Sequence, residues 1–207
     1  MNLNNIIGIG HSLGGYAITH ATNKLRNRFS GLILFDPSIF TQNKYTQNNN
    51  RKKDFIHPIS KRRNLWDSPD EMYKSFSSRL PFKLWDNNVL KDYCEYGLIK
   101  DDDDDIFKLS CPPWAEARMM SGSSPYGIFE IIDNFNQNTL IIRAGGKDSN
   151  NNKDIFSTSV TDPQLSKMFL NGKDLLINDV THFIPQEKPE ECAKIIYDFI
   201  RLITTVN

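Results

Sequence analysis

The stretch that decides the fold is Ile6-Ile7-Gly8-Ile9-Gly10-His11-Ser12-Leu13-Gly14-Gly15. Its first half is short, rich in β-branched residues and ended by glycine, which predicts a buried strand over Ile6–Gly10. Apolar residues then recur at helical spacing, which predicts a helix from Leu13 to about Asn27. Ser12 therefore stands at a sharp turn between a strand and a helix, a position typical of a serine nucleophile.

The small residues beside Ser12 fit this interpretation. A serine on such a turn has a strained backbone, and the strand and helix approach each other too closely for side chains, so we expect Gly10 and Gly14 to meet a steric demand. The start of the helix carries partial positive charge. We therefore predict the Leu13 backbone N–H as the first donor to an oxyanion.

Further along the chain, short and uniformly apolar segments repeat the strand pattern. From Pro189 onward, apolar residues recur every three or four positions and predict a C-terminal amphipathic helix. Apolar strands that alternate with helices predict an α/β fold with a parallel sheet covered on both faces. The expected strands after Ile6–Gly10 are Gly31–Phe35, Thr139–Ile142 and Lys173–Ile177.

A nucleophilic serine needs a base, and the chain has four histidines. The side chain of His11 lies within the turn and would point away from that of Ser12, His20 falls on the following helix, and His57 lies in a polar loop. His182 follows the Lys173–Ile177 strand, so it lies at the same rim of a parallel sheet as Ser12. His182 is therefore the predicted base.

Composition bounds the class of protein. The 25 basic and 25 acidic side chains cancel, which disfavours nucleic acid as a partner. No apolar run approaches the roughly 20 residues of a transmembrane helix, and the N-terminus lacks the pattern of a secretory signal. The three scattered cysteines disfavour a disulfide scaffold and a zinc site. We expect a cytoplasmic protein without metal or organic cofactor.

Three zones differ in composition, and each predicts one part of the domain organisation. Residues 1–40 hold the nucleophile strand, turn, helix and next strand, and residues 137–207 hold the rest of the core. Residues 41–136 are aromatic, charged and irregularly helical. There, Ser68-Pro69-Asp70-Glu71 predicts a helix start, while Asn48–Lys53 and Asp101–Asp105 predict solvated loops.

Gly10–Gly15, the Leu34–Pro37 strand end and Thr181–Glu191 together resemble the α/β-hydrolase superfamily. The middle zone resembles the lid of a branch that includes fungal peroxisomal lipases, through Lys61–Trp66, Arg79–Asp86, Tyr96–Leu98 and Cys111–Ala117. The resemblance implies Ser12 as nucleophile, His182 as general base, and residues 41–136 as a helical lid over an ester or lipid substrate. The last residues do not match the peroxisomal address of such lipases, so that location is not carried over.

The resemblance leaves two candidates for the triad acid. Gly145-Gly146-Lys147-Asp148 matches the usual motif after the Thr139–Ile142 strand, which favours Asp148. If the alignment slides by one glycine, Ser149 takes that place, and the acid comes from the end of the preceding strand, where Asp36 stands. Either carboxylate would orient the imidazole of His182.

The sequence also departs from the superfamily. About four strands normally precede the nucleophile, and the loop after the third supplies a second oxyanion donor. Only eleven residues precede Ser12 here. The sequence thus resembles the C-terminal part of a hydrolase, from a truncated product or an incomplete gene model. We expect an exposed sheet edge, poor solubility and weak activity.

The leading functional interpretation is a serine hydrolase that cleaves carboxylic esters or lipids through an acyl-enzyme. Lid aromatics, including Trp66, Phe82 and Trp85, are candidates for an acyl pocket, with ordinary packing as the alternative for each. The alternative function is a non-catalytic binding module, or a remnant whose sheet edge another chain or segment completes.

Overall fold

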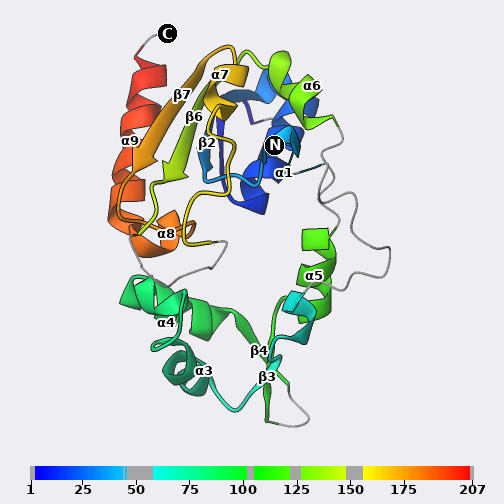
Figure 1. Cartoon of the computed structure of the whole chain (residues 1–207), viewed down its shortest axis with the longest axis vertical. Coiled ribbons are helices and arrows are strands. Elements are labelled where there is room, and N and C mark those ends of the chain that lie inside the picture. Colours follow the sequence, from blue (N-terminus) through cyan, green and yellow to red (C-terminus); the bar gives the residue numbers. More distant parts are fainter. Residues whose placement is uncertain are drawn as a thin grey trace. The chain divides into compact units, whose positions relative to one another are not determined.

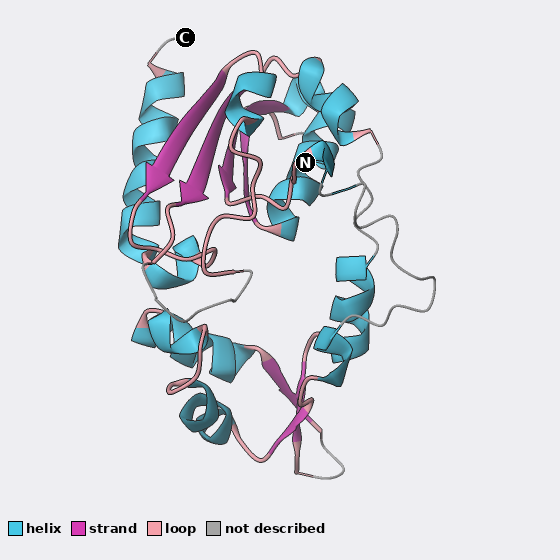
Figure 2. Ribbon diagram, in the orientation of Figure 1, coloured by secondary structure: helices cyan, strands magenta, loops and turns pink. Residues whose placement is uncertain are grey.

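The structure is a computed structural model, and it describes residues 3–43, 45, 58–101, 105–121, 127–147 and 156–205. The chain forms two compact units. The first comprises Met1–Asn49 and Pro125–Asn207, and the second comprises Asn50–Ser124. Figures 1 and 2 show the helices and strands of both units.

The first unit is built on a parallel sheet of four strands, ordered β1-β2-β6-β7 (Figure 1). This confirms the predicted α/β fold, and each strand contains most or all of the segment expected from its apolar pattern. In the described residues, β1 pairs with β2 alone and so forms one edge of the sheet. The strands are β1 Ile6–His11, β2 Phe29–Phe35, β6 Asn138–Ala144 and β7 Gly172–Ile177.

Both faces of the central strands are buried, as the uniformly apolar segments predict. Alternate residues of β2 point to opposite faces: Ile33 joins a cluster with Phe199 of the last helix, while Leu32 joins a cluster with Ile128. Figure 1 shows α9 along one face of the sheet and α1 and α6 on the other. The helices of this unit are α1 Leu13–Lys24, α6 Ile128–Asp133, α7 Leu165–Met168, α8 Ile184–Glu187 and α9 Pro189–Thr204.

Helix α1 ends earlier than the apolar pattern predicts. α1 stops at Lys24, and the next residues form a short 3-10 turn, η1 Arg26–Arg28. The Leu25 N–H donates to both Ala21 and Thr22 carbonyls, which closes the last turn of the helix. β2 then begins at Phe29, so a helix to Asn27 would leave no room for the connection.

The second unit has its own apolar core, formed by Trp66, Met72, Phe76, Leu90, Cys94, Leu98 and Leu109. Ser68 caps α3 as predicted, since its hydroxyl accepts a hydrogen bond from the Glu71 N–H. The helical elements are η2 Pro58–Lys61, α3 Pro69–Phe76, η3 Phe82–Leu84, α4 Asn87–Tyr96 and α5 Pro113–Ser121.

This unit also contains a small antiparallel sheet that the sequence did not indicate. Its strands, in the order β3-β5-β4, are β3 Leu65–Trp66, β5 Phe107–Leu109 and β4 Leu98–Lys100. Segments of two or three residues are too short to show an alternating pattern. The unit also comprises a shorter stretch of the chain than the expected residues 41–136, because α6 packs against the larger sheet.

Further expectations concern the cysteines, membrane-spanning helices and two charged loops. Cys94, Cys111 and Cys192 are free thiols. Across the part of the chain that the structure describes, no helix combines the length and apolar character needed to cross a bilayer. The predicted loop at Asn48–Lys53 and the centre of the Asp101–Asp105 run lie outside the described residues.

Candidate active site

Ser12 lies on a strained turn between β1 and α1. Its backbone has φ 54° and ψ −122°, in a region that residues with a side chain rarely adopt. Hydrogen bonds hold the turn: the Ser12 N–H donates to the Phe35 carbonyl at 3.0 Å, and the Ser12 carbonyl accepts from Gly15 at 3.0 Å. The end of β2 and the start of α1 therefore fix where the Ser12 hydroxyl points.

The steric demand on the turn falls on Gly10 and Gly15. A Cβ on Gly10 would lie 2.5 Å from the Gly14 carbonyl oxygen, and one on Gly15 would lie 2.8 Å from the Cβ of Pro37. Gly14 has nothing within 4 Å of that position, so our prediction for Gly14 was wrong. The reason is that Gly14 contributes its backbone to the crowding around Gly10, whereas its own Cβ position faces open space.

The imidazole of His182 lies within hydrogen-bond distance of the Ser12 hydroxyl. His182 follows β7, and its Nε2 lies 2.9 Å from Ser12 Oγ. The side chain of His182 is 2% exposed, and the ring of Phe156 stacks on it with centroids 5.2 Å apart. The His182 N–H also donates to the Phe156 carbonyl at 3.0 Å, so this contact fixes both the ring and its backbone.

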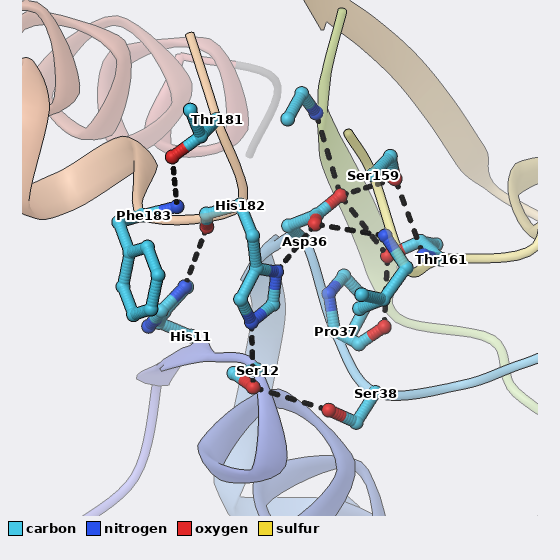
Figure 3. Close-up of polar contacts among 12 residues, drawn as sticks. His11, Ser12, Asp36, Pro37, Ser38, Ser159, Thr161, Thr181, His182 and Phe183 are labelled. Carbon is cyan, nitrogen blue, oxygen red and sulfur yellow. Dashed lines mark hydrogen bonds and ion pairs between the residues drawn. The ribbon is translucent and has the colours of Figure 1, made fainter. Parts of the chain in front are cut away.

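On the other side of the imidazole lies Asp36. His182 Nδ1 and Asp36 Oδ2 are 2.6 Å apart, and the Asp36 side chain is fully buried (Figure 3). Asp36 directly follows β2 and has φ 41°, a left-handed conformation that aspartate tolerates better than most residues. Asp148, the other candidate, lies outside the residues that the structure describes.

The segment after residue 156 surrounds the Asp36 carboxylate with donors. The Ser159 hydroxyl donates to Oδ1, and the Thr161 hydroxyl lies 3.3 Å from the same oxygen (Figure 3). The Val160 N–H donates to Oδ2 at 3.2 Å, and the Ala144 N–H of β6 donates to Oδ1 at 3.3 Å. These donors fix one orientation of the carboxylate and stabilise its negative charge. Ser159 and Thr161 escaped sequence reasoning because their segment follows no motif or periodic pattern.

His11 takes part in the site although it was set aside as a base. Its Nε2 lies 2.8 Å from the His182 carbonyl oxygen, and the two imidazole centroids are 4.8 Å apart. Burial, followed by the nearby His182, lowers the pKa of His11 to about 4, against the raising effects of this hydrogen bond and of Asp36. A neutral His11 thus donates a hydrogen bond to the His182 carbonyl. This bond connects the loop that carries His182 with the turn at Ser12.

A second buried carboxylate, that of Glu187, also holds the loop that carries His182. Glu187 in α8 is 1% exposed, and its Oε1 accepts hydrogen bonds from the N–H and the hydroxyl of Thr181. The Lys147 ammonium lies 3.0 Å from Glu187 Oε2 and balances its charge. Thr181 precedes His182 directly, so this network fixes the backbone from which the imidazole projects.

The remaining predicted site residues fall in two places. Leu13 is the first residue of α1, where N–H groups have no carbonyl partner within the helix. Trp66 lies in the core of the second unit, and Phe82 and Trp85 pack against that core. The ring of Phe82 stacks on Phe76 at 4.1 Å between centroids.

The arrangement is suited to nucleophilic chemistry by the Ser12 hydroxyl. An imidazole that donates through Nδ1 to a carboxylate keeps its Nε2 free to accept the serine proton. The described residues include no group of three or more His, Cys, Asp or Glu side chains placed to hold a metal ion.

Comparison with known proteins bears on the fold of the chain. No family model matches the chain. The abhydrolase domain-containing protein AKT2 of Alternaria alternata is 24% identical over an alignment of 233 positions, gaps included, that covers 94% of this chain and 82% of that protein. A second such protein of that fungus, ACTT2, is 23% identical over the same shares.

Solved structures give the same answer for the fold. The peroxisomal α/β-hydrolase Lpx1 of Saccharomyces cerevisiae has a TM-score of 0.69 at 15% identity, over 97% of this chain and 55% of that one. A thermophilic esterase from Thermogutta terrifontis has a TM-score of 0.57 at 18% identity, over 97% of this chain and 66% of that one. The chain thus spans between half and two thirds of these structures. The parallel sheet, the turn at Ser12 and these likenesses together show that the chain has the fold of the α/β-hydrolases.

Proposed function

We propose that this protein is a serine hydrolase that cleaves carboxylic esters, with Ser12 as nucleophile, His182 as general base and Asp36 as the acid that orients the base. One observation carries the proposal: a continuous hydrogen-bonded chain runs from Ser12 Oγ to His182 Nε2, 2.9 Å away, and from His182 Nδ1 to Asp36 Oδ2, 2.6 Å away. The three residues follow three different strands, so this alignment depends on the whole sheet.

The reaction proceeds in two steps. The Ser12 oxygen attacks the ester carbonyl while its proton passes to His182 Nε2, and His182 then protonates the departing alcohol. Asp36 stabilises the imidazolium that forms between these transfers. Water then gives a proton to His182 and attacks the acyl group, and the Ser12 oxygen leaves with the proton that His182 returns.

Stabilisation of the oxyanion is assigned to the start of α1. The Leu13 N–H follows the nucleophile directly and belongs to the first turn, where partial positive charge accumulates. A donor in this place stabilises the charge that develops on the carbonyl oxygen in the transition state.

The second unit is proposed as the lid, while the packing of Trp66, Phe82 and Trp85 in and against its own core favours ordinary packing for these three rings. The place of the unit in the chain supports the lid role, because it is inserted between β2, which leads into Asp36, and β6. The esterase among the structural neighbours also favours esters as the substrate class.

Turnover of p-nitrophenyl esters with acyl chains from two to twelve carbons tests the proposal. We expect the Ser12→Ala variant to lose at least about 1,000-fold in kcat/KM, because it lacks the hydroxyl that attacks the ester. Ser77→Ala, an exposed serine in the second unit, is the matched control and keeps the wild-type rate. Equal turnover by Ser12→Ala would refute the assignment, and a folded wild type that cleaves none of these esters would favour a binding module.

A further inference from the structure

A second serine lies against the nucleophile. Ser38 Oγ is 3.1 Å from Ser12 Oγ, which also lies 2.9 Å from His182 Nε2. Figure 3 shows the Ser12 hydroxyl in contact with both groups, the imidazole and the Ser38 hydroxyl. His182 is the neighbour of the Ser12 oxygen that leads on to Asp36. Ser38 is a further neighbour, outside that hydrogen-bonded chain.

The backbone around Ser38 fixes its place. The Ser38 N–H donates to the Ser12 carbonyl at 2.9 Å, so the two serines are joined through the main chain as well. The Thr161 hydroxyl donates to the Pro37 carbonyl at 2.8 Å, and the Tyr45 hydroxyl donates to the Ser38 carbonyl at 3.3 Å. Hydrogen bonds therefore hold three consecutive backbone groups around the Ser38 side chain: the Pro37 carbonyl, the Ser38 N–H and the Ser38 carbonyl.

The direction of the serine–serine hydrogen bond follows from the donors available. A hydroxyl group has one proton to donate. His182 Nδ1 donates to Asp36, so Nε2 accepts the Ser12 proton when the site is ready to react. The Ser12 oxygen then has no proton left for Ser38, and the Ser38 hydroxyl must be the donor.

We propose that Ser38 is a further catalytic residue, whose hydroxyl donates a hydrogen bond to the Ser12 oxygen and stabilises the charge on it; this rests on the proposed function. When the Ser12 proton moves to His182, negative charge grows on the oxygen that Ser38 contacts. When the acyl-enzyme breaks down, the same oxygen departs with charge and is stabilised again. Ser38 transfers no proton, and a hydrogen bond to a charged oxygen is stronger than one to a neutral oxygen.

The first test is the rate of labelling by a fluorophosphonate probe, which reacts with activated serines. We expect Ser38→Ala to lower the second-order labelling rate about 10- to 100-fold, the range for a lost hydrogen bond to a charged group. Ser38→Thr restores the hydroxyl and should bring the rate back to within a few-fold of wild type. Ser30→Ala is the control in the same unit, because Ser30 lies near the start of β2 and its hydroxyl donates to the Ile6 carbonyl at 3.4 Å, away from the Ser12 hydroxyl.

A second readout separates catalysis from structural support. In the Ser12→Cys variant, alkylation by iodoacetamide at position 12 is followed by mass spectrometry of its peptide, apart from the three native thiols, and its pH dependence reports the pKa of the new thiol. Adding Ser38→Ala should move this profile upward by about one pH unit, since a donor to the thiolate is lost. A residue that only supports the turn would leave the profile in place.

The outcomes are distinct. Wild-type labelling that Ser38→Ala does not slow, or an alkylation profile that does not move, overturns the role of Ser38 and leaves the role of Ser12 standing. A folded wild type that the probe does not label at all overturns the proposed function, and the role of Ser38 with it.

Discussion

The Asp36 carboxylate is fully buried and accepts hydrogen bonds from the Ser159 hydroxyl, two backbone N–H groups and the His182 imidazole. Such a group holds an imidazole in one tautomer and one orientation. Replacing the carboxylate by an amide keeps the shape of the side chain but allows the imidazole to take the wrong tautomer.

The choice between the two candidate acids gives the first prediction. We expect Asp36→Asn to lower kcat/KM for a p-nitrophenyl ester by on the order of 10³- to 10⁴-fold. Asp148→Asn is the matched substitution at the other candidate and should keep activity within about twofold. The reverse result, with Asp148→Asn inactive and Asp36→Asn active, would move the acid to the segment after β6.

His11 gives a prediction about stability and pH. Its pKa falls from 6.5 to about 4 on folding, so the unfolded chain binds more protons between these values. Stability from this group is complete above about pH 6.5 and is lost as the pH falls toward 4, by about 2 kcal/mol between pH 8 and pH 5. Urea unfolding at both pH values measures it.

The comparison variant for this experiment is His11→Gln, which has no titrating group at that position. We expect the wild type to lose about 2 kcal/mol more than His11→Gln over the same pH interval. If the two proteins lose the same free energy of unfolding, the His11 imidazole is not held neutral by the fold.

At the scale of the elements, Gly10 and Gly14 flank the turn between β1 and α1. The sequence motif treats them alike, but their steric surroundings differ. A Cβ on Gly10 meets backbone atoms at 2.5 Å, and backbone cannot move aside as a side chain can. Gly14 lies in α1 with open space around its Cβ position, where alanine favours the helix.

We therefore predict opposite effects on stability. Gly10→Ala should destabilise the protein by about 2 kcal/mol or more, because the strand and helix must separate. Gly14→Ala should stabilise it by up to about 1 kcal/mol. Thermal unfolding of both variants, followed by circular dichroism, measures the effects; equal destabilisation would mean that the helix packs differently against β1.

The elements also show what sequence alone could predict. The parallel sheet followed from apolar segments long enough to show a pattern, and Ser12 and His182 were singled out because both follow parallel strands. Ser38, Ser159 and Thr161 had no such signal, since a hydrogen bond between side chains far apart in sequence leaves no periodic trace. The short strands β3, β4 and β5 were missed for another reason, because two or three residues are too few to show an alternating pattern.

At the scale of the whole molecule, two units have separate cores. Met72 is fully buried in the core of the second unit, and Ile132 is fully buried against the larger sheet of the first. Because each cluster draws its buried residues from its own unit, a cavity in one core removes contacts from that unit alone.

This separation predicts local effects of core mutations. Met72→Ala, which costs about 2–5 kcal/mol of packing, should speed amide hydrogen exchange in α3 and α4 and leave β2 and β6 unchanged. Ile132→Ala is the matched variant and should do the reverse. Faster exchange throughout the chain in both variants would mean that the two units unfold as one.

The central claim is that the Ser12 hydroxyl is an activated nucleophile, and covalent labelling tests it most directly. The folded protein is treated with a fluorophosphonate probe, digested, and the adduct is located by mass spectrometry. We predict one adduct on Ser12, no adduct in Ser12→Ala, and labelling slowed at least about 100-fold in His182→Ala, which lacks the base. A folded wild-type protein that carries no adduct, or carries it on another residue, would contradict the claim.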